Sequence, residues 1–203
     1  MTSGPTFWIG ADPGGRGNFG IAILAGNDKP QTASVNCADE AVVFVRARVH
    51  HPPAGVGVDA PLWWSSGPSG DRHADQWLRR TYGLGGGQVQ AANSLRGAAL
   101  VQGAMFVQRI REAYPAVPVT ESHPTALLNA LLGNDWATFA ARFHVNAEPR
   151  NQHERDALIA AVAAREGFTG NWTHDLGQKR LAGEQDPARY WLAPVHYYWP
   201  GPR

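Results

Sequence analysis

The stretch GADPGGRGNFGIAIL, residues 10–24, decides how the chain begins to fold. An apolar run ends at Asp12, a glycine-rich segment follows, and a second apolar run starts at Phe19. Two apolar runs joined by a glycine-rich loop are typical of a β-hairpin. The carboxylate at the end of the first run can be a turn residue, part of a phosphate cradle, or a metal ligand.

Each interpretation of Asp12 makes a different demand on the residues around it. An aspartate before Pro-Gly is common in turns, where its side chain bonds its own backbone. A phosphate-binding P-loop requires a helix after the glycines, opened by Lys and Ser or Thr, whereas NFGIAIL has the pattern of a strand. The glycines therefore indicate a hairpin, and of the three interpretations the phosphate cradle fits Asp12 least.

The rest of the chain alternates between strand and helix patterns. Three antiparallel strands are expected first, and helices then alternate with parallel strands. This order predicts an α/β fold with a mixed five-stranded sheet and helices on both faces. The strands are expected at 6–12, 19–26, 31–37, 54–62 and 117–122. The helices are expected at 38–51 (stopped by Pro52 and Pro53), 71–82, 93–114 (capped by Asn93 or Ser94), 124–133, 135–143 and 151–167.

Length and composition predict one domain over residues 1–203, with an elaborated loop insertion at about 63–92 and an aromatic tail at 168–203. The 18 basic and 17 acidic side chains give a formal net charge of +1, so any site for a polyanion must be local. A lone cysteine, Cys37, excludes an internal disulfide framework. No signal peptide or membrane-spanning pattern is seen, and a soluble cytoplasmic protein is the expectation.

Acidic residues lie at comparable places along this pattern. Asp12, Asp59 and Glu121 stand at or near strand ends, and Asp156 lies on a helix one turn after His153. Ligands gather beyond the strand ends of such sheets, so these carboxylates can converge. Converging oxygen ligands would hold Mg²⁺ or Mn²⁺, whereas without a cation they would repel one another and raise at least one pKa.

The helix that carries Asp156 has a feature that favours convergence. Ala157, Ala160 and Ala164 continue the face of Asp156 with small residues. Small residues would let this helix lie close against a sheet and bring Asp156 near the strand ends.

Every one of these residues also has a simpler interpretation. Asp59 can cap the loop that follows it, and Asp156 can be a first-turn acid favoured by the helix dipole, with His153 on the surface. Glu121 can pair with a nearby arginine, and His123 can simply precede the proline at a helix start. Their order along the chain, rather than any one of them, favours a shared site.

Four segments in order resemble the RNase H-fold nucleases: IGADPGGRGNFGIAIL, GVGVDAPL, VTESHPTALLNALLG and HERDALIAAVAA. The nearest resemblance is to a bacterial and archaeal family of predicted nucleases related to the RuvC-type Holliday junction resolvases. In the resolvases an aspartate ends the first strand, an acid ends the fourth, and a His-x-x-Asp or Asp-x-x-Asp pair lies on the last core helix. Asp12, Asp59, His153 and Asp156 match those places, and the stretch from Glu121 to Pro124 is similar to the acid-to-proline motif of the fifth strand.

The resemblance implies an RNase H-like fold and a metal-dependent nuclease that hydrolyses phosphodiester bonds by a two-metal-ion mechanism. Mg²⁺ or Mn²⁺ would bind to Asp12, Asp59 and Asp156, with Glu121 and His153 assisting catalysis. It also implies a nucleic acid substrate, DNA or RNA, and a homodimer, with no membrane partner. The expected substrate contacts are Arg16, Trp63, Arg72, Arg79 and His123.

Several features depart from the resolvase pattern. Asp59 stands where the resolvases carry glutamate, and TALLNALL lacks the lysine that follows their proline, which weakens the four-way-junction reading. The insertion around Arg72, Asp75 and Arg79 is more like the predicted-nuclease family. Charged pairs on a surface helix are the alternative for these three residues, and packing of the loop onto the core is the alternative for Trp63.

Two other functions compete with the nuclease. A non-catalytic nucleic-acid-binding or interaction module would keep the acidic pocket only as structure, and the weak net basicity favours it slightly over a tight DNA enzyme. An actin-like or sugar-kinase-like nucleotide binder starts with a similar Asp-Gly hairpin. Those proteins normally require two such domains, and this chain has room for one.

Overall fold

The structure is a computed structural model that describes residues 5–26, 28–67, 70–92, 95 and 97–202. The expected hairpin is confirmed: β1 (Phe7–Asp12) pairs antiparallel with β2 (Phe19–Ala25). In its register Asp12 lies opposite Gly20, at the end of the pair that leads into the turn. The carboxylate in question therefore stands at the last ladder position of β1.

The sheet has the expected five strands in mixed orientation. The other strands are β3 (Gln31–Val35), β4 (Gly55–Val58) and β5 (Val119–Glu121), and the order across the sheet is β3-β2-β1-β4-β5. β3 is antiparallel to β2, whereas β4 runs parallel to both β1 and β5. The carboxyl ends of β1, β4 and β5 consequently lie at one edge of the sheet.

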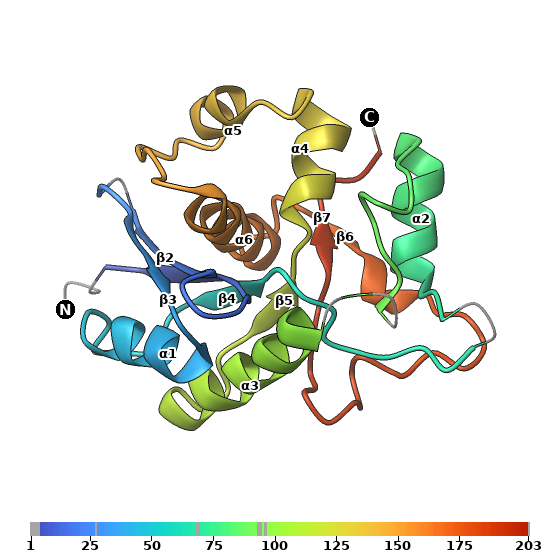
Figure 1. The fold of residues 1–203 in the computed structure, drawn as a ribbon, viewed down its shortest axis with the longest axis horizontal. Coiled ribbons are helices and arrows are strands. Elements are labelled where there is room, and N and C mark those ends of the chain that lie inside the picture. Colours follow the sequence, from blue (N-terminus) through green and yellow to red (C-terminus); the bar gives the residue numbers. More distant parts are fainter. Residues whose placement is uncertain (1–4, 27, 68–69, 93–94, 96, 203) are drawn as a thin grey trace.

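Helices cover both faces of the sheet, as the pattern predicts (Figure 1). The long helix α6 (Gln152–Phe168) packs on β1, β2 and β4, and α4 (Pro124–Leu132) and α5 (Trp136–Arg142) lie on its side. On the opposite face, α1 (Ala38–Arg46) contacts α3 (Gly97–Ala113). The expected caps of α3, Asn93 and Ser94, lie outside the described residues.

α1 is shorter than the helical pattern predicts. It ends at Arg46 instead of running to the two prolines. The chain turns there, which buries Val49, and the backbone carbonyl of Val49 accepts a hydrogen bond of 2.6 Å from the Tyr114 hydroxyl. Val49, which belongs to the helical pattern expected over residues 38–51, is thus buried by a turn after α1 and not by the helix itself.

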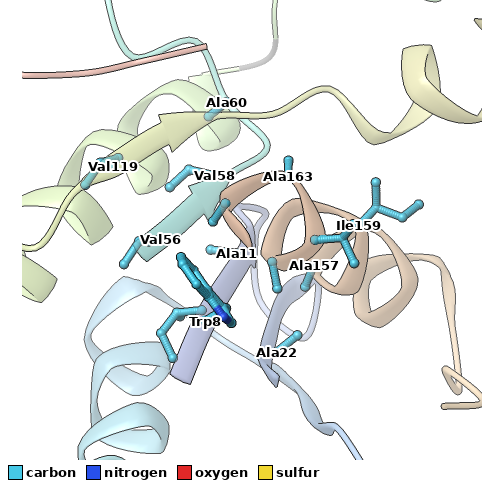
Figure 2. Close-up of a cluster of buried hydrophobic side chains, with 14 of the residues drawn as sticks. Trp8, Ala11, Ala22, Val56, Val58, Ala60, Val119, Ala157, Ile159 and Ala163 are labelled. Atoms are coloured by element: carbon cyan, nitrogen blue, oxygen red, sulfur yellow. The ribbon is translucent and has the colours of Figure 1, made fainter. Parts of the chain in front are cut away.

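The contact between α6 and the sheet is close because small residues lie on both sides. A Cβ atom placed on Gly57 of β4 would lie 1.9 Å from the carbonyl oxygen of Ala160, and one on Gly10 of β1 would lie 1.9 Å from that of Ala157. Figure 2 shows Ala157 and other α6 side chains beside the strands of the sheet. From the sequence, the alanines of α6 predict a close approach of this helix to the sheet. The glycines on the facing strands make the same approach possible from the side of the sheet.

Replacing Gly57 with alanine should therefore destabilise the protein by about 3 kcal/mol, the upper part of the range for overpacked cores. The added methyl group meets backbone atoms of α6, which cannot move aside without shifting the helix. Urea unfolding of Gly57→Ala measures the loss. Gly15→Ala is the matched control, because a Cβ there meets nothing within 4 Å, and equal losses in both variants would refute the packing argument.

The aromatic tail is part of the core. β6 (His174–Asp175) pairs with β7 (Tyr198–Trp199), and the 3-10 turn η2 (Leu176–Gln178) contacts α2 (His73–Tyr82) of the insertion. His196 extends the sheet beyond β5: the Glu121 backbone N–H donates to its carbonyl at 2.7 Å, and its own N–H donates to Val119 at 3.0 Å. The tail thus covers the β5 edge, next to Glu121.

Along the described residues, no helix combines the length and the apolar character needed to cross a lipid bilayer.

Candidate functional site

Three strand ends and one helix place the acidic residues. Asp12 is the last residue of β1, Asp59 follows β4 directly, and Glu121 is the last residue of β5. Asp156 lies in the second turn of α6, whose first turn is capped by the Asn151 side chain accepting from the Glu154 N–H at 3.0 Å. Parallel pairing of the strands and close packing of α6 put these four residues in one region.

Asp12 is in direct contact with His153. The Nδ1 atom of His153 lies 2.7 Å from Oδ2 of Asp12. Burial raises the pKa of Asp12 from 3.8 to about 6, with a smaller rise from the negative charge of Asp156, although the His153 hydrogen bond acts in the opposite direction. The same hydrogen bond raises the pKa of His153. This hydrogen bond therefore links the protonation of the two side chains.

The negative charges of three other acids act on Asp59. Burial raises its pKa well above 3.8, and the negative charges of Asp12, Asp156 and Glu121 raise it further. Asp156 itself accepts a hydrogen bond of 2.9 Å from Nε of Arg155. Such repulsion between partly buried carboxylates is what a bound divalent cation would relieve.

The three expected metal ligands do not form a complete metal-binding site in this structure. Within the described ranges, no three His, Cys, Asp or Glu side chains are grouped closely enough to be recognised as a metal site. Asp12, Asp59 and Asp156 do share the electrostatic coupling that the strand-end argument predicts. Their assignment as ligands stays a prediction.

Glu121 forms an ion pair with Arg72, which is the alternative to a catalytic role that the sequence analysis gave for this residue. The guanidinium of Arg72 donates to both carboxylate oxygens of Glu121, at 2.6 and 2.8 Å, and to both of Asp75, at 2.8 and 2.9 Å. Oε2 of Glu121 also accepts the Leu62 N–H at 3.0 Å. Each oxygen of Glu121 thus has a charged donor, so its main visible role is to hold Arg72; catalysis by Glu121 stays a prediction.

Arg72 and Trp63 are buried, in contrast to the exposed substrate contacts that the insertion led us to expect. Each is 1% exposed, and the guanidinium carbon lies 4.3 Å from the centre of the indole. The Trp63 Nε1 donates to Glu184 at 2.8 Å. The buried indole therefore has no exposed face on which a nucleic acid base could stack. The loop packs onto the core, which is the alternative that the sequence analysis gave for Trp63.

The other two arginines of the expected substrate contacts, Arg16 and Arg79, are not among the residues that line the cavity described below. Arg79 forms an ion pair of 2.7 Å with Asp71 and donates to the Val89 carbonyl at 2.9 Å, so it ties together the segments on either side of α2. Arg16 is exposed in the turn between β1 and β2. The contacts of Arg79 and the exposed position of Arg16 leave their role in substrate binding a prediction.

His123 lies where the α4 N-terminus meets the site. Burial lowers the pKa of its imidazole to about 4, so the ring is neutral near pH 7. Its Nδ1 and the adjacent Ser122 hydroxyl are buried without a hydrogen-bond partner among the described residues. Buried polar atoms are normally satisfied by protein, water or ligand, so these two atoms mark a place where a partner is missing.

A cavity of about 280 Å³ connects these groups. Asp12 and Asp59 border it together with Arg72, Asp75, Glu121 and His123. Its lining also includes side chains that the sequence did not single out, namely Gln88, Gln90, Ser122 and Thr125. The glycine-rich run before Gln88 marked this loop as elaborated, but an isolated glutamine carries no pattern that would identify it.

Comparisons with known proteins return one structural similarity. No family model and no curated protein matches the sequence. Among solved structures, the RuvC structure of Thermus thermophilus aligns with a TM-score of 0.45 and 17% identical residues, covering 82% of this chain and 96% of that one.

Proposed function

We propose that the protein is a metal-dependent nuclease that hydrolyses phosphodiester bonds in nucleic acid with two Mg²⁺ or Mn²⁺ ions. The observation that carries the proposal is the placement of Asp12 and Asp59 at the ends of the adjacent strands β1 and β4, bordering one cavity, with α6 packed on both strands so that His153 contacts Asp12 at 2.7 Å. Asp156 lies one turn further along α6, and its negative charge acts on both aspartates. The order of the four sequence motifs adds support from their resemblance to RNase H-fold nucleases. The whole chain, residues 1–203, is proposed to form this one domain.

The chain's own residues have distinct parts in this proposal. Asp12, Asp59 and Asp156 would hold the cations, which lower the pKa of bound water and neutralise charge on the phosphate. His153 would keep Asp12 oriented through its 2.7 Å contact and take up or release a proton at Nδ1. Arg72 and Glu121 would keep the cavity wall in place behind the acids.

Metal binding should depend on pH because of Asp12. Its folded-state pKa of about 6 exceeds its usual 3.8, so the metal-free protein gains stability from this group as pH falls through 6. Mn²⁺ requires the ionised carboxylate and must displace that proton below pH 6. At one fixed concentration, about 100 times the Kd at pH 7.5, Mn²⁺ should raise Tm by roughly 5 to 10 °C near pH 7.5 and by clearly less near pH 5.

Thermal unfolding with and without Mn²⁺ at the two pH values measures this difference. A Mn²⁺ shift that is equal at both pH values would contradict the role of Asp12 as a ligand.

A cleavage screen tests the proposed activity itself. Labelled single-stranded, duplex and branched DNA and RNA are incubated with Mn²⁺ or Mg²⁺, with EDTA as the negative control. Cleavage that requires metal and disappears in Asp156→Asn would support the nuclease. Binding without cleavage in the whole panel would favour the non-catalytic nucleic-acid module, and Tm stabilisation by ATP without metal-dependent cleavage would favour the nucleotide binder. A homodimer remains part of the proposal and is checked by light scattering.

A further inference from the structure

Four carboxylates and one guanidinium belong to the described residues that line the cavity. Two of the carboxylates are Asp12 and Asp59, the proposed metal ligands, and the other two are Glu121 and Asp75. The positive charge of Arg72 is shared between Glu121 and Asp75, and the guanidinium is 1% exposed. Of the described residues that line the cavity, Arg72 is the only arginine or lysine, so no unpaired cation there attracts a second phosphate.

The remaining polar lining is uncharged. Gln88, Gln90 and Thr125 contribute amide and hydroxyl groups, and His123 is neutral near pH 7. Ser122 also lines the cavity. Among the described residues three buried side-chain atoms have no hydrogen-bond partner, and two of them, the Ser122 hydroxyl and Nδ1 of His123, belong to residues of this lining; the third is the Tyr197 hydroxyl. Groups of this kind suit a neutral ligand that carries both hydrogen-bond donors and acceptors.

The cavity is also small and partly apolar. Its volume of about 280 Å³ lies at the low end of ligand pockets, which hold roughly 300 to 1,000 Å³. Pro13, Pro61 and Ala99 supply apolar surface around the polar groups. A single heterocyclic ring system with polar edges fits this size and lining, whereas a stacked base pair does not.

We propose that this cavity receives the base of an unpaired nucleotide next to the phosphate that is cut. This inference rests on the proposed function and adds the substrate class, namely single strands or duplexes with an unpaired nucleotide at the cleavage site. Glutamine amides pair well with base edges, and the acids repel phosphates except where metal is bound. A paired base would first have to leave its stack, and the energy of unstacking and unpairing opposes its entry.

Nucleosides test the cavity independently of the metal, because they carry no phosphate. Saturation-transfer NMR with adenosine, guanosine, cytidine, uridine and thymidine in EDTA is expected to detect binding of at least one nucleoside to the wild-type protein. Ala99→Phe on α3 fills the cavity and should weaken that binding by tenfold or more. Val101→Phe, on the same helix at a residue that is 58% exposed, is the matched control and should bind as the wild type does.

The folding of each variant is checked by circular dichroism, and Ala99→Leu replaces Ala99→Phe if the larger side chain prevents folding. Gln90→Ala changes an exposed residue of the cavity lining and provides a second test, because it should weaken nucleoside binding several-fold. Failure of all five nucleosides to bind, or equal binding by wild type and the filled variant, would overturn the base pocket and leave a cavity that holds water only.

The two proposals fail in different ways. Absence of metal-dependent cleavage together with nucleoside binding that Ala99→Phe removes would reject the nuclease and keep the base pocket. Metal-dependent cleavage of a blunt duplex as fast as of the matching single strand would reject the pocket and keep the nuclease.

Discussion

Asp12→Asn is expected to lower metal-dependent cleavage by on the order of 10³-fold or more while the protein stays folded. Asparagine removes the negative charge that a divalent cation needs, yet it preserves the size of the side chain. Because burial already favours the neutral form of Asp12, loss of the charge should not destabilise the metal-free protein. Cleavage rates and the Mn²⁺-induced shift in Tm are measured on the same preparations.

Asp28→Asn is the matched control for this experiment. Asp28 is an exposed acid in the turn after β2, so the same chemical change there should leave both cleavage and the Mn²⁺ shift unchanged. An Asp12→Asn protein that cleaves at the wild-type rate would remove Asp12 from the catalytic machinery.

Arg72→Met is expected to cost about 3 to 5 kcal/mol of unfolding free energy, because it leaves two buried carboxylates without their cation. Glu121 and Asp75 are 2% and 1% exposed, and each loses two charged hydrogen bonds. Burial already raises the pKa of Glu121, so protonation relieves the unpaired charge and the deficit should shrink as the pH falls. Urea unfolding at neutral and mildly acidic pH measures both effects.

Arg109→Met provides the comparison on the surface. Arg109 pairs with Asp39 and Glu112, but its side chain is 46% exposed and the pairs are screened by solvent, so its loss should cost far less unfolding free energy than the loss of Arg72. Equal losses for Arg72→Met and Arg109→Met would show that the buried network does not stabilise the fold.

The sheet could be predicted from the sequence because each of its strands is marked by a local pattern of apolar residues. The apolar runs around residues 10–24 and the strand that ends before Asp59 carry their own turn or burial signals, and strand ends of parallel neighbours meet at one edge. The same geometry predicts that the acids at these strand ends lie near one another. The effect of the Asp12, Asp156 and Glu121 charges on Asp59 agrees with this, whereas the role of Asp12, Asp59 and Asp156 as metal ligands stays a prediction.

Other features depend on contacts between distant parts of the chain. Arg72 has the sequence context of a charged surface helix, and only the placement of Glu121 and Trp63 around it explains its burial. β6 and β7 have two residues each, too few for a periodic pattern. The pairing of His196 with β5 is likewise decided by tertiary packing.

The central claim is tested most directly by a crystal soaked in Mn²⁺ and analysed by anomalous scattering, which needs no choice of substrate. The account predicts anomalous peaks bound by Asp12, Asp59 and Asp156. Absence of any peak at these residues, with the three carboxylates turned apart or paired with arginines, would contradict it.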